Sequence, residues 1–213
     1  MDRPSISTTA MGIARDTLLP SLSLHSGLSI IAYTAARTTN RVELKDWLWP
    51  SGQVLNAWWT ALGRPTSFDP VLLRAAFQQI LWDDRLLLFE VTVWGLRLFY
   101  RIASRSISRG KDDPRYEESK KQPGFWNKEF FAEFVPEAVF QSLITLPFTA
   151  TFRDITPAAP PEYAGLIRGA AVGLFAAGFA METLADTQIE RHKKEGRKGL
   201  VREGVWSIVR HPK

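Results

Sequence analysis

Long uncharged stretches alternate with densely charged ones along this chain. Four segments lack charged side chains: Thr17–Ala36, Trp47–Gly63, Ala138–Phe152 and Gly169–Met181. Residues 101–128 and 190–203 are instead crowded with charge. A helix of a soluble domain carries polar residues at every turn of one face, so blocks of this kind are more typical of helices in a bilayer. The pattern predicts an all-α fold, a multi-span transmembrane helical bundle.

The segment Thr17–Ala36 is the best candidate for a membrane span. It has 20 residues and is rich in Leu and Ile, which is about the length needed to cross roughly 30 Å of hydrocarbon. A cleaved signal peptide is the alternative, because Thr34-Ala35-Ala36 resembles a processing site. The shorter segment Trp47–Gly63 carries four Trp residues, which favour the bilayer interface, so it either spans the membrane or lies flat on it.

The segment Pro70–Tyr100 is long enough for a tilted helix or a re-entrant pair, but Asp83, Asp84 and Arg85 interrupt it. Charges deep in a bilayer are costly unless they are paired or face a polar cavity. Two interpretations stay open. These residues form a solvated turn between two short helices, or the two aspartates line a polar interior together with Glu90.

The C-terminal half predicts a helical hairpin, with arms Phe130–Phe152 and Tyr163–Asp186 joined by a turn with three prolines. Both flanks of the hairpin are basic, and the positive-inside tendency places both in the cytosol, as two spans between them require. We therefore divide the chain into three parts: N-terminal membrane helices (1–100), a basic cytosolic loop (101–128), and the hairpin with the C-terminal segment that follows it (129–213).

Composition narrows the class of partner. The mean hydropathy of −0.12 is low for a membrane protein because charge is gathered in the loops. With no Cys there is no disulfide, thiolate zinc site or Cys nucleophile in this sequence. The net charge of +5 would suit nucleic acid, but the basic residues fall beside predicted spans. We expect contact with the lipid bilayer and no contact with nucleic acid.

Three segments contain candidate functional residues. The first is Arg105–Tyr116, which follows the hydrophobic stretch Pro70–Tyr100. A helix is predicted to end at Gly110, and a polar turn follows it. The cationic side chains here are Arg105, Arg109, Lys111 and Arg115. Arg grips phosphate oxygens with two hydrogen bonds, so the group suits a dinucleotide phosphate. It equally suits anionic lipid headgroups.

The second segment places Glu182 and Asp186 four residues apart at the cytosolic end of the last predicted span, on one helical face. Acids there accept hydrogen bonds from ribose hydroxyls or an amide, or hold a cation. Pairing with Arg191 or simple solvation of the helix end is the alternative. The three His residues show no ligand spacing with these acids, so no metal site is predicted.

The third segment, Gly204–Lys213, reads Gly-Val-Trp-Ser-Ile-Val-Arg-His-Pro-Lys. Four ordered motifs carry a resemblance: Gly110, Lys111, Asp113, Arg115 and Tyr116; Phe125 and Trp126; Gly178, Phe179, Glu182, Asp186 and Gln188; Gly204, Trp206, Arg210, His211 and Pro212. Together they resemble the steroid 5α-reductase-like membrane family, in particular its uncharacterised branch in fungi and bacteria.

The resemblance implies an integral membrane protein, in eukaryotes of the endoplasmic reticulum, whose C-terminal half holds NADPH at the cytosolic side. It implies reduction of a carbon–carbon double bond, commonly one conjugated to a carbonyl of a steroid or other lipid, with hydride supplied by the cofactor. The implied cofactor contacts are Glu182, Asp186, Arg210 and His211, with Arg105, Arg109, Lys111 and Arg115 as weaker candidates for the phosphates. No catalytic residue is identified, and Tyr100, Tyr116, Asp83 and Glu90 are open candidates for the acid.

The sequence departs from the family's pattern after His-Pro. The family continues with Asn or a similar residue, then Tyr and an acidic pair on a further hydrophobic helix, whereas this sequence stops at Lys213. We therefore expect a truncated chain that is inactive by itself. Two alternative functions stay open: a membrane methyltransferase of the isoprenylcysteine or phospholipid type, which binds S-adenosylmethionine, and a non-catalytic membrane pseudoenzyme.

Overall fold

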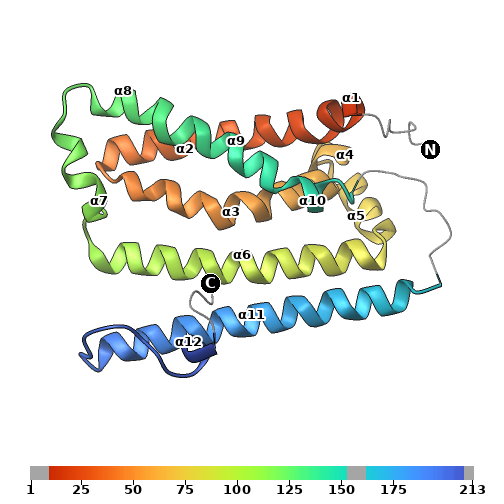
Figure 1. Ribbon diagram of the computed structural model, residues 1–213. Coiled ribbons are helices and arrows are strands. Elements are labelled where there is room, and N and C mark those ends of the chain that lie inside the picture. The colour runs from red at the N-terminus through yellow and green to blue at the C-terminus, as the bar shows by residue number, and fades with distance from the viewer. Residues whose placement is uncertain (1–9, 153–161, 209–213) are drawn as a thin grey trace. The chain divides into compact units, whose positions relative to one another are not determined.

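The computed structural model describes residues 10–152 and 162–208, which belong to two compact units (Figure 1). The first unit is Met1–Ile155 and the second is Thr156–Lys213. Every regular element within the described residues is helical, and no β-strand occurs among them. The all-α prediction is confirmed for this part of the chain.

Four long helical rods build the first unit. They are α1–η1–α2 (Ala10–Ile13, Ala14–Leu18, Leu19–Thr39), α3–η3–α4 (Lys45–Trp58, Trp59–Gly63, Arg64–Thr66), α6 (Trp82–Arg109) and α8–η5–α9 (Phe125–Glu129, Phe130–Phe134, Val135–Ile144). The short elements are η2 (Val42–Leu44), α5 (Pro70–Gln79), α7 (Pro114–Glu117), η4 (Ser119–Lys121) and α10 (Leu146–Thr149). Helix α3 packs between α2 and α6, and α9 covers α2 (Figure 1).

Local sequence sets the ends of these helices. The long helix α6 ends at Gly110, whose φ of 67° is in the left-handed region that Gly adopts readily, as the sequence predicted. Asn40 ends α2 in the same left-handed conformation. Helix α5 begins after Asp69, whose carboxylate accepts hydrogen bonds from the next two free backbone N–H groups.

The charged residues that interrupt Pro70–Tyr100 lie next to a break between two helices. Helix α5 ends at Gln79, and Asp83 and Asp84 occupy the first turn of α6, where carboxylates face the positive end of the helix dipole. The guanidinium of Arg85 donates hydrogen bonds to the carbonyls of Ile80, at 3.0 Å, and of Gln78, at 2.9 Å. The structure therefore favours the turn interpretation, although α6 is a long helix and not a short one.

Helix α2 buries its polar face and exposes its apolar face. Ser21, His25 and Ser29 are buried, whereas Ile30 and Ile31 are 54% and 67% exposed. The same inversion is seen on α9, where Gln141 is buried and Phe140 is 60% exposed. A helix on the surface of a soluble domain shows the opposite arrangement.

Aromatic residues close one end of the first unit. Tyr33 on α2 makes edge-to-face contacts with Phe130 and Phe134, with ring centroids 4.9 and 5.3 Å apart. Its hydroxyl donates to the backbone carbonyl of Trp126 at 3.0 Å. These contacts attach α8, η5 and α9 to α2 and position the polar loop beside them.

The second unit consists of α11 (Ala164–Lys194) and the short α12 (Val205–Ile208). Within the described residues, α11 is the one helix that is long and apolar enough to cross a membrane by length and composition. The predicted hairpin arms fall in different units, with Phe130–Phe152 in the first and Tyr163–Asp186 in the second.

Candidate functional site

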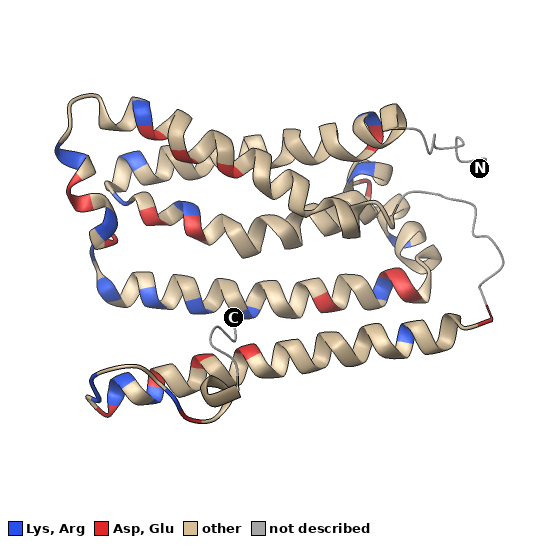
Figure 2. Ribbon diagram, viewed as in Figure 1, with Lys and Arg blue, Asp and Glu red and all other residues tan. Residues whose placement is uncertain are grey.

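The C-terminal end of α6 and the loop that follows it carry four of the predicted site residues. Basic and acidic residues are concentrated along the chain at this end of the first unit, around α7 (Figure 2). Arg105 and Arg109 are one helical turn apart on α6, and the left-handed turn at Gly110 directs the chain toward Lys111 and Arg115. This arrangement places the cations beside the α2–α3 corner.

Glu43, in the α2–α3 corner, is a buried acid that sequence reasoning missed. It is 4% exposed and accepts hydrogen bonds from the Ser106 hydroxyl at 2.7 Å and from the Arg109 guanidinium at 2.9 Å. Arg41 pairs with the same carboxylate. Because Glu43 and its partners on α6 are more than sixty residues apart in sequence, no local pattern pointed to this cluster.

Asp112, in the loop after α6, is a second buried acid. It is 3% exposed, accepts from the backbone N–H groups of Val42 at 2.8 Å and Glu43 at 3.0 Å, and pairs with Lys120. Burial by itself raises the pKa of Asp112, but the Lys120 ammonium and the backbone N–H donors outweigh it and hold this pKa below its ordinary value. Asp112 therefore fastens the loop to the α2–α3 corner as a carboxylate.

Asp113 holds the cations Arg109 and Arg115. Its carboxylate is 3.0 Å from Arg109 Nη1 and 3.0 Å from Arg115 Nε, and it caps α7. The hydrogen bond from Arg115 is the main reason that the pKa of Asp113 falls to about 2. Two of the four predicted phosphate ligands are thus already paired with acids of their own unit.

Arg105, Lys111 and Arg115 are exposed, and of these three only Arg115 is held by Asp113, so Arg105 and Lys111 stand apart from the paired cations. Arg105 lines a cavity of about 270 Å³ together with Asp46, Trp49, Ile102 and Glu137, which come from α3, α6 and α9. Lys111 lies in the loop directly after Gly110. Of the predicted phosphate ligands, these two are the better placed to contact an added anion.

The open candidates for the catalytic acid lie in different surroundings. Tyr100 on α6 is 75% exposed. Tyr116 is half-buried, with Lys45 Nζ 5.6 Å and the Arg115 guanidinium 5.4 Å from its ring centroid. Burial raises the pKa of Tyr116 above its ordinary value. Asp83 is exposed and Glu90 is partly buried, on different turns of α6.

In the second unit, Glu182 and Asp186 lie on one face of α11, as predicted from their spacing. Asp186 is 2% exposed and Glu182 is partly buried. The other two predicted cofactor contacts, Arg210 and His211, lie outside the described residues. The first unit therefore holds the predicted phosphate ligands, and the second holds the acids.

The chain after α11 folds back onto the helix next to these acids. The backbone N–H of Val205 donates to Gln188 Oε1 at 3.2 Å, and Trp206 Nε1 donates to the Ala185 carbonyl at 3.1 Å. Both acceptors are within two residues of Asp186. The third and fourth family-like motifs thus meet in the second unit.

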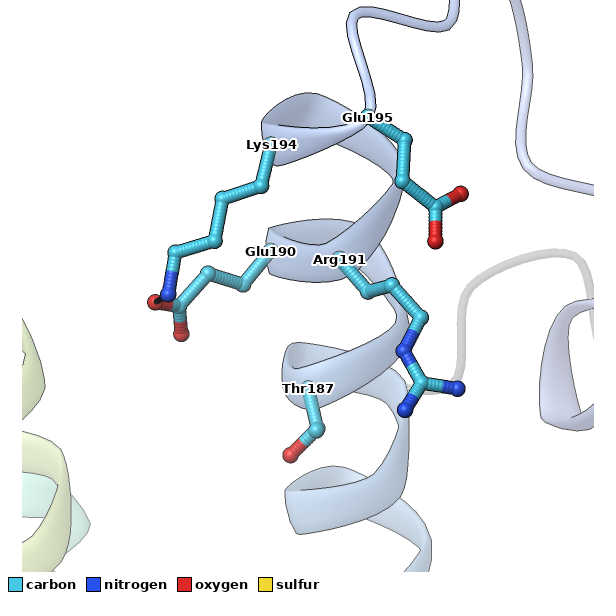
Figure 3. A pocket seen from close by; sticks show the side chains of 5 residues that line it. All are labelled: Thr187, Glu190, Arg191, Lys194 and Glu195. Carbon is cyan, nitrogen blue, oxygen red and sulfur yellow. Dashed lines mark ion pairs between the residues drawn. The ribbon is translucent and has the colours of Figure 1, made fainter.

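The C-terminal end of α11 carries a surface pocket of about 380 Å³ lined by Thr187, Glu190, Arg191, Lys194 and Glu195. Glu190 and Lys194 form an ion pair of 2.8 Å on one side of the helix, while Arg191 and Glu195 point to the other (Figure 3). The acids Glu182 and Asp186 are not among its lining residues.

Among the described residues, no group of three or more His, Cys, Asp and Glu side chains is arranged so that it could hold a metal ion.

Comparisons with known proteins add one finding. The model of a family described as "Protein of unknown function (DUF1295)" matches residues 32–213, which include every predicted site residue. No match is found among curated proteins or among solved structures.

Proposed function

Because the chain belongs to the DUF1295 family, which is related to steroid 5α-reductase-like membrane proteins, we propose that it is an integral membrane oxidoreductase. Its substrate would be the carbon–carbon double bond of a steroid or other lipid, and its cofactor NADPH. In a eukaryotic cell its membrane would be the endoplasmic reticulum.

The observation that carries the proposal is that the four motifs meet in pairs. In the first unit, Phe125 of the second motif belongs to a buried hydrophobic cluster. Tyr116 of the first motif and Trp126 of the second both pack against that cluster. In the second unit, Gln188 of the third motif holds the backbone of Val205, beside Gly204 of the fourth. The four motifs thus form one local assembly in each unit.

The inverted faces of the first unit support several membrane spans. Helices α2 and α9 direct Ile and Phe outward and Ser, His and Gln inward. Water would penalise such an apolar surface, whereas lipid accommodates it, and inside the unit Ser29 donates to the Phe134 carbonyl of the neighbouring rod. We therefore propose that the rods of the first unit cross the bilayer together with α11.

The donors and acceptors present suit NADPH in part. Carboxylates such as Glu182 and Asp186 accept hydrogen bonds from ribose hydroxyls or from a carboxamide, and the exposed Arg105 and Lys111 suit phosphate oxygens. Arg109 and Arg115 contribute differently, since they hold the loop that carries Lys111 through Glu43 and Asp113. Bound NADPH would supply the hydride, and the chain's own groups would orient it and exclude water.

NADPH binding to the purified, detergent-solubilised chain tests the proposal. We expect Asp186→Asn and Arg105→Gln to weaken binding at least tenfold, since each removes one charge from the proposed contacts. Glu190→Gln is the matched control on α11, because its partner Lys194 is solvent-exposed and the change should leave binding within twofold. Absence of NADPH binding, or binding of S-adenosylmethionine in its place, would contradict a reductase.

A further inference from the structure

Polar side chains from three helices meet around Gly52 in the interior of the first unit. Gly52 is on α3, and a Cβ built on it would lie 2.7 Å from Gln141 Oε1 and 3.2 Å from His25 Nδ1. His25 on α2 is 3% exposed and Gln141 on α9 is 1% exposed. Because glycine has no side chain, Gln141 and His25 can both pack this closely against α3.

Neighbouring hydrogen bonds orient both side chains. Asn56 accepts from the Thr60 hydroxyl through Oδ1 at 3.3 Å, so its Nδ2 is the atom directed at His25 Nε2, 3.4 Å away. A neutral imidazole whose Nε2 accepts carries its proton on Nδ1. Gln141 donates through Nε2 to Glu137 Oε1 at 2.9 Å, which leaves its Oε1 directed toward Gly52.

The acceptor at this point lacks a partner. Gln141 Oε1 is buried and has no hydrogen-bond partner in the described part of the chain. A buried acceptor without a donor is unfavourable, and such an atom calls for a water or a ligand to complete it. His25 Nδ1–H is a donor close to the same glycine. A group that fits must therefore accept one hydrogen bond and donate another.

We propose that His25 and Gln141 form a binding site for a single hydroxyl group beside Gly52. A hydroxyl accepts from His25 Nδ1–H and donates to Gln141 Oε1, whereas a ketone or ether oxygen only accepts and would leave Gln141 unsatisfied. The hydroxyl belongs to a lipid alcohol or to a bound water. If the hydroxyl belongs to a lipid alcohol, that alcohol would be the substrate class of the reductase, and this part of the proposal rests on the proposed function.

Nitrogen-15 NMR of histidine-labelled full chain in detergent micelles tests the site without any cofactor. The His25 signals are identified by their loss in His25→Gln. We expect the Nδ1–H tautomer, with an Nδ1 shift typical of a hydrogen-bonded group. A sterol with a free 3-hydroxyl should move that shift if the source is a lipid, whereas its methyl ether should not. If neither sterol moves it and the hydrogen-bonded shift persists in the delipidated chain, the source is water.

Two variants keep the test decisive. Gln141→Leu removes the acceptor and should return the Nδ1 shift toward that of a free N–H and abolish any response to the sterol alcohol. Gly52→Ala should do the same, because its Cβ would come 2.7 Å from Gln141 Oε1 and displace that side chain. Gly27→Ala on α2 is its control, since a Cβ there meets nothing within 4 Å. The proposal is overturned by an Nε2–H tautomer, or by an Nδ1 shift that is the same in Gln141→Leu as in the wild type.

A failure of NADPH to bind would leave this result untouched, because no step of the NMR experiment uses NADPH. The two proposals therefore fail separately. A positive sterol arm alone would assign the interior of the first unit to lipid-alcohol binding, whatever chemistry the second unit supports.

Discussion

Gly204 lies directly against the carboxamide of Gln188. A Cβ on Gly204 would come 2.2 Å from Gln188 Nε2, and the φ of 61° at Gly204 is in the left-handed region. The close approach allows Gln188 Oε1 to accept from the backbone N–H of Val205 at 3.2 Å. This pair of residues seats the C-terminal segment on α11 beside Asp186.

Gly204→Ala should release that segment. The left-handed backbone costs a side-chain-bearing residue about 1–2 kcal/mol, and the Cβ would also displace Gln188. We expect faster tryptic cleavage at Arg197, Lys198 and Arg202. Gly173→Ala on α11, where a Cβ meets nothing within 4 Å, is the control. Equal cleavage rates in the two variants would show that the contact with Gln188 does not hold the segment.

Glu43→Gln should destabilise the first unit. The carboxylate has a side chain only 5% exposed and neutralises Arg41 and Arg109, so removing its charge leaves two partly buried guanidinium groups with a weaker partner. Loss of one member of a buried ion pair typically costs about 3–5 kcal/mol. The measurement is the thermal unfolding midpoint in detergent.

Glu118→Gln serves as the control for that variant. Its ion pair with Lys121 has side chains that are 87% and 70% exposed, and such pairs contribute little. A midpoint for Glu43→Gln as high as that of Glu118→Gln would mean that the buried pairing does not contribute to stability.

Stability should fall in acid because of the carboxylates after Gly110. The pKa of Asp113 is about 2 in the folded chain, against an ordinary value of 3.8, and the pKa of Asp112 is also lowered. Since the unfolded chain binds protons more readily, the stabilisation is complete above about pH 4 and is lost as the pH falls toward 2. Unfolding midpoints measured across this range should decline less in Asp113→Asn than in the wild type. Parallel curves would exclude this contribution.

Single cysteines distinguish lipid-facing from water-facing positions, and the native chain contains no Cys to interfere. Ile31 is 67% exposed on α2, and Lys111 is exposed in the loop after α6. In membrane vesicles we expect Lys111→Cys to react readily with a membrane-impermeant maleimide from one side. Ile31→Cys should react slowly, because thiolate formation requires water. Rapid labelling of Ile31→Cys from either side would contradict a membrane-embedded α2.

Sequence by itself determined the features that depend on near neighbours. The end of α6 at Gly110 and the shared helical face of Glu182 and Asp186 follow from propensities and spacings within a few residues, whereas the sequence left both interpretations of Asp83 and Asp84 open. The all-helical class followed from the same local patterns. Three of the four uncharged stretches each lie within one continuous helical rod, whereas Ala138–Phe152 continues beyond α9 through α10.

Only the tertiary structure decided which charged and polar groups meet. Glu43 reaches Arg109 on α6, and Gln141 on α9 comes to face His25 on α2 across Gly52. Partners this distant in sequence leave no local spacing signal, because their contact depends on how whole helices pack. For the same reason, the pairing of Arg109 with Glu43 could not be predicted from the arginine-rich segment itself, whose composition fits paired and unpaired cations equally well.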